Sequence, residues 1–111
     1  MAQFYKLDKV KELAGGDDSF IIVLVQTFLD EIPVDLKNME DSVESGDAAL
    51  AYQFAHKMKP SFQLFEIEVL NYIKLLESWS QGAINKDEAG LALSTILEKA
   101  NAAINEMQND F

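Results

Sequence analysis

The residue best suited to chemistry is His56, the only histidine in this chain of 111 residues. A neutral imidazole nitrogen is a competent nucleophile toward a phosphoryl group. One histidine does not make a metal site, and the sequence offers neither a second histidine nor a cysteine to join it. A general base would need an orienting carboxylate and a nucleophile, which the sequence does not place. Residue type alone leaves two interpretations, a phosphoryl acceptor or an ordinary surface histidine that titrates in place.

The neighbours of His56 form a polar strip if the segment is helical, because each residue then advances about 100°. Lys59 lies about 60° around from His56 on the next turn, and Gln63 lies two turns on, nearly in line. Tyr52 and Gln53 lie one turn before the histidine. The opposite face gathers the apolar residues Ala51, Phe54, Ala55, Met58, Phe62 and Phe65. We therefore expect His56 to face solvent, with the Lys59 ammonium close enough to offset the charge of a phosphoryl group.

Helical periodicity extends over the whole chain. We expect a short helix over residues 5–13 and then four long helices. The last three of these long helices cover residues 48–65, 67–79 and 86–107. The first long helix has a buried face made of Phe20, Leu24, Phe28, Ile32, Leu36, Met39 and Val43. Asp17 to Ser19, Asp47 and Asn85 are predicted N-caps, the last in a capping box with Glu88. Gly15-Gly16 and Gly46 are predicted helix ends. Pro33 is expected to bend its helix without ending it.

Four long helices joined by short connections predict an all-α fold. We expect a single domain over residues 1–111, an up-down-up-down antiparallel four-helix bundle with a short extra N-terminal helix. The first helix is too short to run the full length of the bundle, and we expect it to cover one end of the bundle.

Composition excludes several classes of function. The formal net charge of −10 argues against nucleic acid and anionic membranes as partners. The N-terminus lacks a signal-peptide pattern, and the longest apolar run, residues 20–25, is too short to span a bilayer. We therefore expect a cytoplasmic protein. No nucleotide-binding loop, metal cluster or nucleophile–base pair indicates an enzyme.

The segment around the histidine resembles a known family. It reads Ala55-His56-Lys57-Met58-Lys59-Pro60-Ser61, similar to the Ala-His-x-Leu-Lys-Gly-Ser motif of histidine-containing phosphotransfer (HPt) domains. The resemblance extends over about residues 20–77. Its other elements are Phe28-Leu29 with Pro33 and Leu36 before the motif, Gly46-Asp47, and Leu70 with Leu76-Glu77 after it.

The resemblance implies a phosphorelay carrier without catalytic activity or cofactor of its own. His56 would accept the phosphoryl group, through Nε2, and Lys59 and Gln63 would assist with the phosphate and the incoming receiver domain. The partners would be response-regulator receiver domains, which supply the aspartate and the metal ion, and a hybrid sensor histidine kinase. We expect a monomer. The alternative is a module that cannot be phosphorylated and only binds a receiver or another helical partner.

Two positions depart from the family pattern. Pro60 replaces the glycine four residues after the histidine, and we expect a kink or a widened turn there. It either only bends the helix or changes how closely a receiver approaches. Glu66 replaces the glycine that often ends this helix, so we expect the third and fourth helices to meet through a different turn or to run more continuously.

The expected docking surface includes Tyr52, Gln53 and Pro60 around the histidine. A second apolar stripe, Ile22, Val25 and Leu29, follows the same helix as Phe28. Two interpretations are open: burial of this stripe under the short first helix, or a partly exposed patch near His56 that receives the receiver domain.

Overall fold

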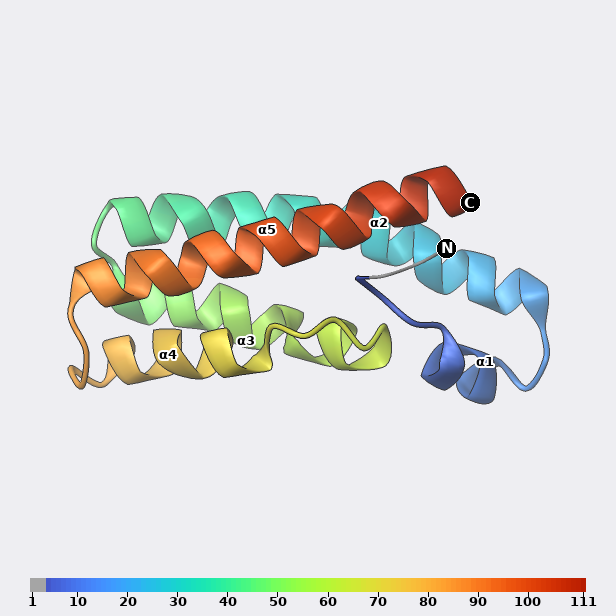
Figure 1. The fold of residues 1–111 in the computed structure, drawn as a ribbon, viewed down its shortest axis with the longest axis horizontal. Coiled ribbons are helices and arrows are strands. Elements are labelled where there is room, and N and C mark those ends of the chain that lie inside the picture. The colour runs from blue at the N-terminus through green and yellow to red at the C-terminus, as the bar shows by residue number, and fades with distance from the viewer. Residues whose placement is uncertain (1–3) are drawn as a thin grey trace.

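The computed structural model describes residues 4–111, and within that range the chain is helical and compact, without strands. The helices are α1 (Asp8–Ala14), α2 (Asp18–Glu44), α3 (Ala48–Leu64), α4 (Leu70–Ser80) and α5 (Lys86–Asp110) (Figure 1). The predicted all-α class is confirmed. None of the helices in the described range is both long enough and apolar enough to cross a bilayer.

Local capping chemistry sets most helix ends. The Asp17 carboxylate accepts hydrogen bonds from two backbone N–H groups in the first turn of α2, and Asp47 does the same for the Leu50 N–H at 3.0 Å. At α5, Asn85 and Glu88 cap each other's backbone N–H in a complete capping box. These predicted caps are confirmed, and α2 runs through Pro33 as expected.

The long helices pack in antiparallel pairs. α2 contacts α3 and α5, and α4 contacts the same two helices, while α1 packs against α2 (Figure 1). Phe28 of α2 lies edge-on to Phe62 of α3, with ring centroids 6.4 Å apart, and the Asp35 carboxylate of α2 meets the Lys57 ammonium at 3.1 Å. Residue numbers therefore fall along α2 as they rise along α3, which places Leu36 about level with His56.

The buried face of α2 agrees with the prediction from Phe28 to Val43 but not in the first two turns. Ile21 and Val25 are buried there, whereas Phe20 is exposed and Leu24 is only half-buried. Residues 20–25 are all apolar, so periodicity does not choose a face. Packing of α1 against α2 supplies the choice, because it needs a partner face that the local sequence does not define.

Two predicted helix starts are wrong by three residues. The first helix begins at Asp8, and residues 4–7 form a non-helical segment before it. In that segment Tyr5 is buried, its hydroxyl donates to the Asp110 carboxylate at 2.6 Å, and the Lys6 N–H donates to the Phe65 carbonyl at 2.8 Å. Burial and then the Asp110 hydrogen bond raise the pKa of Tyr5. The segment thereby ties the end of α3 to the end of α5.

The other wrong start is that of α4, which begins at Leu70 because a turn separates it from α3. Glu66 has a φ of 54°, in the left-handed region. Its N–H donates to the Gln63 carbonyl, and the Ile67 N–H donates to the Phe62 carbonyl at 2.9 Å. This is the Schellman motif. Gly46 and Gly82 end α2 and α4 with the same pair of hydrogen bonds and with φ values of 79° and 77°.

The expectation of a more continuous connection at Glu66 is therefore wrong, because a turn separates the two helices. The expectation that this turn differs from that of the family stays a prediction. The chain makes the turn that glycine makes elsewhere, with a residue that carries a Cβ. A left-handed conformation costs a non-glycine residue roughly 1 kcal/mol. One carboxylate oxygen of Glu66 is also buried, without a hydrogen-bond partner in residues 4–111. The turn is consequently a strained point held in place by the packing around it.

We predict that Glu66→Gly raises the free energy of unfolding by about 1 kcal/mol, since glycine adopts this conformation without strain. Urea denaturation measures the change as a shifted midpoint at constant slope. The matched control is Gly82→Ala, which meets no neighbouring atom within 4 Å and should lose about 1 kcal/mol through conformation alone. If both Glu66→Gly and Gly82→Ala lower the free energy of unfolding, the Glu66 side chain stabilises the fold by more than its backbone conformation costs.

Candidate functional site

His56 lies in the middle of α3 with its side chain in solvent. Ala51, Ala55 and Met58 on the opposite face are buried in the core, whereas His56 itself is exposed. The predicted orientation of the histidine is confirmed. An exposed imidazole keeps a ring nitrogen accessible to a reacting group.

On one side of His56, Tyr52 links the histidine to α4. The Tyr52 and His56 ring centroids are 5.7 Å apart, with the ring planes inclined by 44°. The Tyr52 hydroxyl donates to the Glu77 carboxylate of α4 at 2.9 Å. That hydrogen bond is the main cause of the raised pKa of Tyr52, with smaller contributions from desolvation and from the charge of Glu77. Tyr52 is half-buried, so its ring forms a wall beside the imidazole.

On the other side of His56, the Lys57 side chain forms an ion pair with a residue of α2. Its ammonium lies 3.1 Å from the carboxylate of Asp35, a residue only 5% exposed. A buried carboxylate without a counter-charge is costly, so Lys57 serves Asp35 first. The sequence analysis did not single out Asp35. Its signal is a carboxylate on the apolar face of an amphipathic helix.

Lys59 is the lysine left for the site. It is half-buried, lies beside His56 by helical phase, and forms no ion pair within residues 4–111. Gln63, two turns after His56, is exposed, and so is Gln53, one turn before it. The helix therefore brings Tyr52, Gln53, Lys59 and Gln63 around His56, as the sequence predicts.

Pro60 is exposed one turn after His56 and does not end the helix, which continues to Leu64. Proline has no backbone N–H, so the His56 carbonyl lacks its usual helical donor. The expected kink stays a prediction. The ring of Pro60 is part of the surface that surrounds the histidine.

Of the two interpretations of the apolar stripe, burial holds for Val25, whereas a docking patch near His56 is wrong in two ways. Val25 is fully buried in the core and is not available to a partner. Ile22 is 50% exposed, but the α2–α3 register places it about 20 Å along the axis from His56. Leu29 is half-buried and about 10 Å along the axis from the histidine. The Asp35–Lys57 pair instead places Val34, which is 59% exposed, on α2 at the level of the site.

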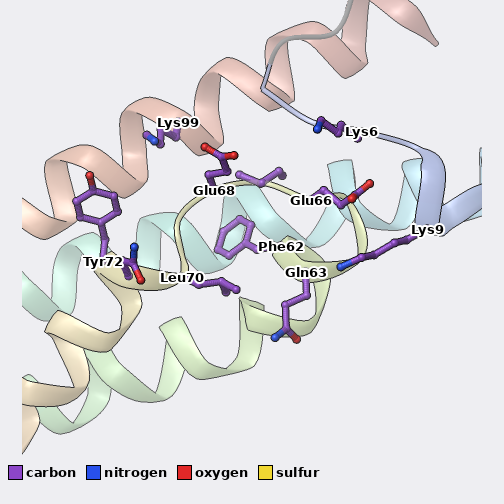
Figure 2. A pocket seen from close by; sticks show the side chains of 11 residues that line it. Lys6, Lys9, Phe62, Gln63, Glu66, Glu68, Leu70, Tyr72 and Lys99 are labelled. Atoms are coloured by element: carbon purple, nitrogen blue, oxygen red, sulfur yellow. The ribbon is translucent and has the colours of Figure 1, made fainter.

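A cleft of about 770 Å³ opens at the Gln63 end of the strip. Phe62 and Leu70 line it together with lysines from three separate segments, Lys6, Lys9 and Lys99 (Figure 2). Glu66 and Glu68 line it too, and the Lys99 ammonium lies 5.8 Å from the centre of the Tyr72 ring. Sequence reasoning missed this cleft because its residues are brought together only by the fold.

Residues 4–111 contain no cluster of three or more histidine, aspartate or glutamate side chains that could hold a metal ion. Comparison of the chain with protein-family models, with curated proteins and with solved structures finds no match.

Proposed function

We propose that this protein is a histidine phosphotransfer domain, in which α2 to α5 form an up-down-up-down four-helix bundle and His56 carries the phosphoryl group. The observation that supports it best is an exposed histidine in the middle of a long helix, beside a lysine that forms no ion pair within residues 4–111. The chain has a formal net charge of −10, so the protein surface binds an anionic group only where a cation lies close by. Lys59 supplies one.

The proposed reaction is a displacement at phosphorus. The lone pair of a neutral His56 nitrogen, Nε2 by resemblance to the family, forms the new N–P bond as the P–O bond to a receiver aspartate breaks and the aspartate carboxylate leaves. The reverse step passes the group to a second receiver. Phosphoryl transfer depends on positioning and charge stabilisation, and the chain contributes one ammonium to them. The receiver and its metal ion supply the rest, so the protein is a carrier and not a catalyst.

The proposed partners are receiver domains and a hybrid sensor kinase. A receiver aspartyl phosphate must approach His56 over a surface made of Tyr52, Gln53 and Pro60, with Val34 across the seam to α2. Binding without transfer is the second candidate function, and the missing helical donor at the His56 carbonyl is the observation that favours it.

We predict that His56→Gln abolishes phosphoryl transfer and leaves the fold intact. The exposed side chain contributes little to packing, so the free energy of unfolding should change by less than about 0.5 kcal/mol. The measurement uses a panel of receiver domains labelled with a small-molecule phosphodonor and follows label on this chain. Label that persists in His56→Gln would refute the assignment, and receiver binding without any label on the wild type would favour the binding module.

We predict that Lys59→Ala slows transfer about tenfold, since a charge-assisted hydrogen bond to the phosphoryl group is worth about 1.5 kcal/mol. The same labelling assay gives the rate. Lys11→Ala is the matched control, because Lys11 is an exposed lysine on α1, outside the polar strip around His56. Equal rates for the two variants would show that only the overall charge matters.

We predict that Pro60→Ala raises both the free energy of unfolding, by up to about 3 kcal/mol, and the transfer rate. Alanine restores the helical donor to the His56 carbonyl and removes a ring from the docking face. Pro33→Ala makes the same backbone change in α2 and should raise stability alone. A transfer rate that Pro60→Ala leaves unchanged would place the proline ring outside the docked interface.

A further inference from the structure

We infer that Tyr52 is a positioning residue for His56 and that Glu77 acts on the histidine through it. The inference rests on the proposed function of His56 and adds a residue pair to it. Two interactions make a chain from α4 to the imidazole: the Tyr52 hydroxyl on the Glu77 carboxylate at 2.9 Å, and the Tyr52 ring against the His56 ring at 5.7 Å.

The Tyr52 ring is held at both ends. Its backbone belongs to α3, and its hydroxyl is fixed to a different helix, so the ring does not swing with α3 side-chain motion alone. Glu77 is itself half-buried between these helices. A tyrosine anchored in this way differs from Tyr72, the partner of Lys99 beside the cleft.

His56 lacks such anchors of its own. Among residues 4–111, its one specific side-chain contact is the Tyr52 ring. An exposed helical side chain distributes itself over two common χ1 wells and a broad χ2. Contact with a fixed aromatic wall favours the orientations beside that wall. Two χ1 wells and a roughly two-fold χ2 give about four orientations, so selection of one of them raises its population by up to about fourfold.

The Tyr52–Glu77 pair also controls a charge. A free carboxylate near His56 would repel the phosphoryl group that the histidine accepts. The hydroxyl of Tyr52 donates to the carboxylate and keeps it turned toward the tyrosine. Loss of the hydroxyl therefore has two effects in the same direction, a looser imidazole and an untethered carboxylate.

The test follows the His56 side chain by NMR in the full chain, without phosphate, together with transfer kinetics. In Tyr52→Phe and in Glu77→Leu we expect the His56 χ1 populations to even out and the maximal single-turnover rate of phosphoryl transfer to fall about threefold. The receiver concentration that gives half of that rate should stay unchanged. The double variant should lose no more than either single variant, because the two residues act as one unit. Glu77→Gln, whose amide oxygen still accepts from the tyrosine, should keep the wild-type populations.

Tyr72→Phe is the matched control and should leave the His56 resonances and the maximal transfer rate unchanged. Unaltered χ1 populations in Tyr52→Phe would overturn the inference. A change only in the receiver concentration that gives half of the maximal rate would also overturn it, because the Tyr52 hydroxyl would then act in docking and not in positioning. A wild-type chain that accepts no phosphoryl group would refute the proposed function. The χ1 populations would still decide whether Tyr52 positions the histidine.

Discussion

The register between α2 and α3 is the constraint on which the site depends. Phe28 packs its ring against Phe62 and Phe65, with centroids 6.4 and 4.9 Å away, and these aromatic contacts fix how far α3 slides along α2. Aromatic pairs of this size dominate core energetics and tolerate little displacement. A slide of one helical turn would move Lys57 about 5 Å from Asp35 and leave a buried carboxylate unpaired.

The same register sets what surrounds the histidine. Phe65, which packs against Phe28, directly follows the last residue of α3, and Glu66 then makes the turn into α4. The cost of a left-handed glutamate is of order 1 kcal/mol, small beside the burial of Phe62, Phe65 and Ile67 that the turn permits. The turn returns α4 along α3 so that Glu77 reaches Tyr52. Core packing at one end of α3 thus determines a polar contact beside His56, more than two turns away.

The sequence predicts those parts of the fold that local chemistry decides. Asp17, Asp47 and the Asn85–Glu88 pair cap helices wherever they occur, because each satisfies backbone donors within its own turn. The start of α4 is different. Ile67 and Val69 are apolar at positions that continue a helical pattern, yet both are buried in a non-helical connection. Burial alone does not separate a helix start from an extended segment when the turn residue, Glu66, gives no glycine signal.

The features of the site also separate into those set within one helix and those set by packing between helices. The orientation of His56 and the strip around it follow from the phase of a single helix, so the sequence predicts them. Pairs between helices, such as Asp35 with Lys57 and Tyr52 with Glu77, require a register that only the assembled core provides. The position of Ile22 was wrong for the same reason: it shares a helix with residues level with His56, but the register places it about 20 Å away.

Charge then limits what the protein can do alone. The motif carries two lysines, Lys57 and Lys59, and Lys57 forms an ion pair with the buried carboxylate of Asp35. Lys99, on α5, lies against the Tyr72 ring at the far end of the cleft. Lys59 is left as the cation beside the imidazole. One ammonium can partly screen a phosphoryl group that carries close to two negative charges, but it cannot also neutralise the charge that develops on the leaving aspartate oxygen. In the proposed function, His56 holds a phosphoryl group, and the transfer of that group requires a partner that brings its own positive charge to the encounter.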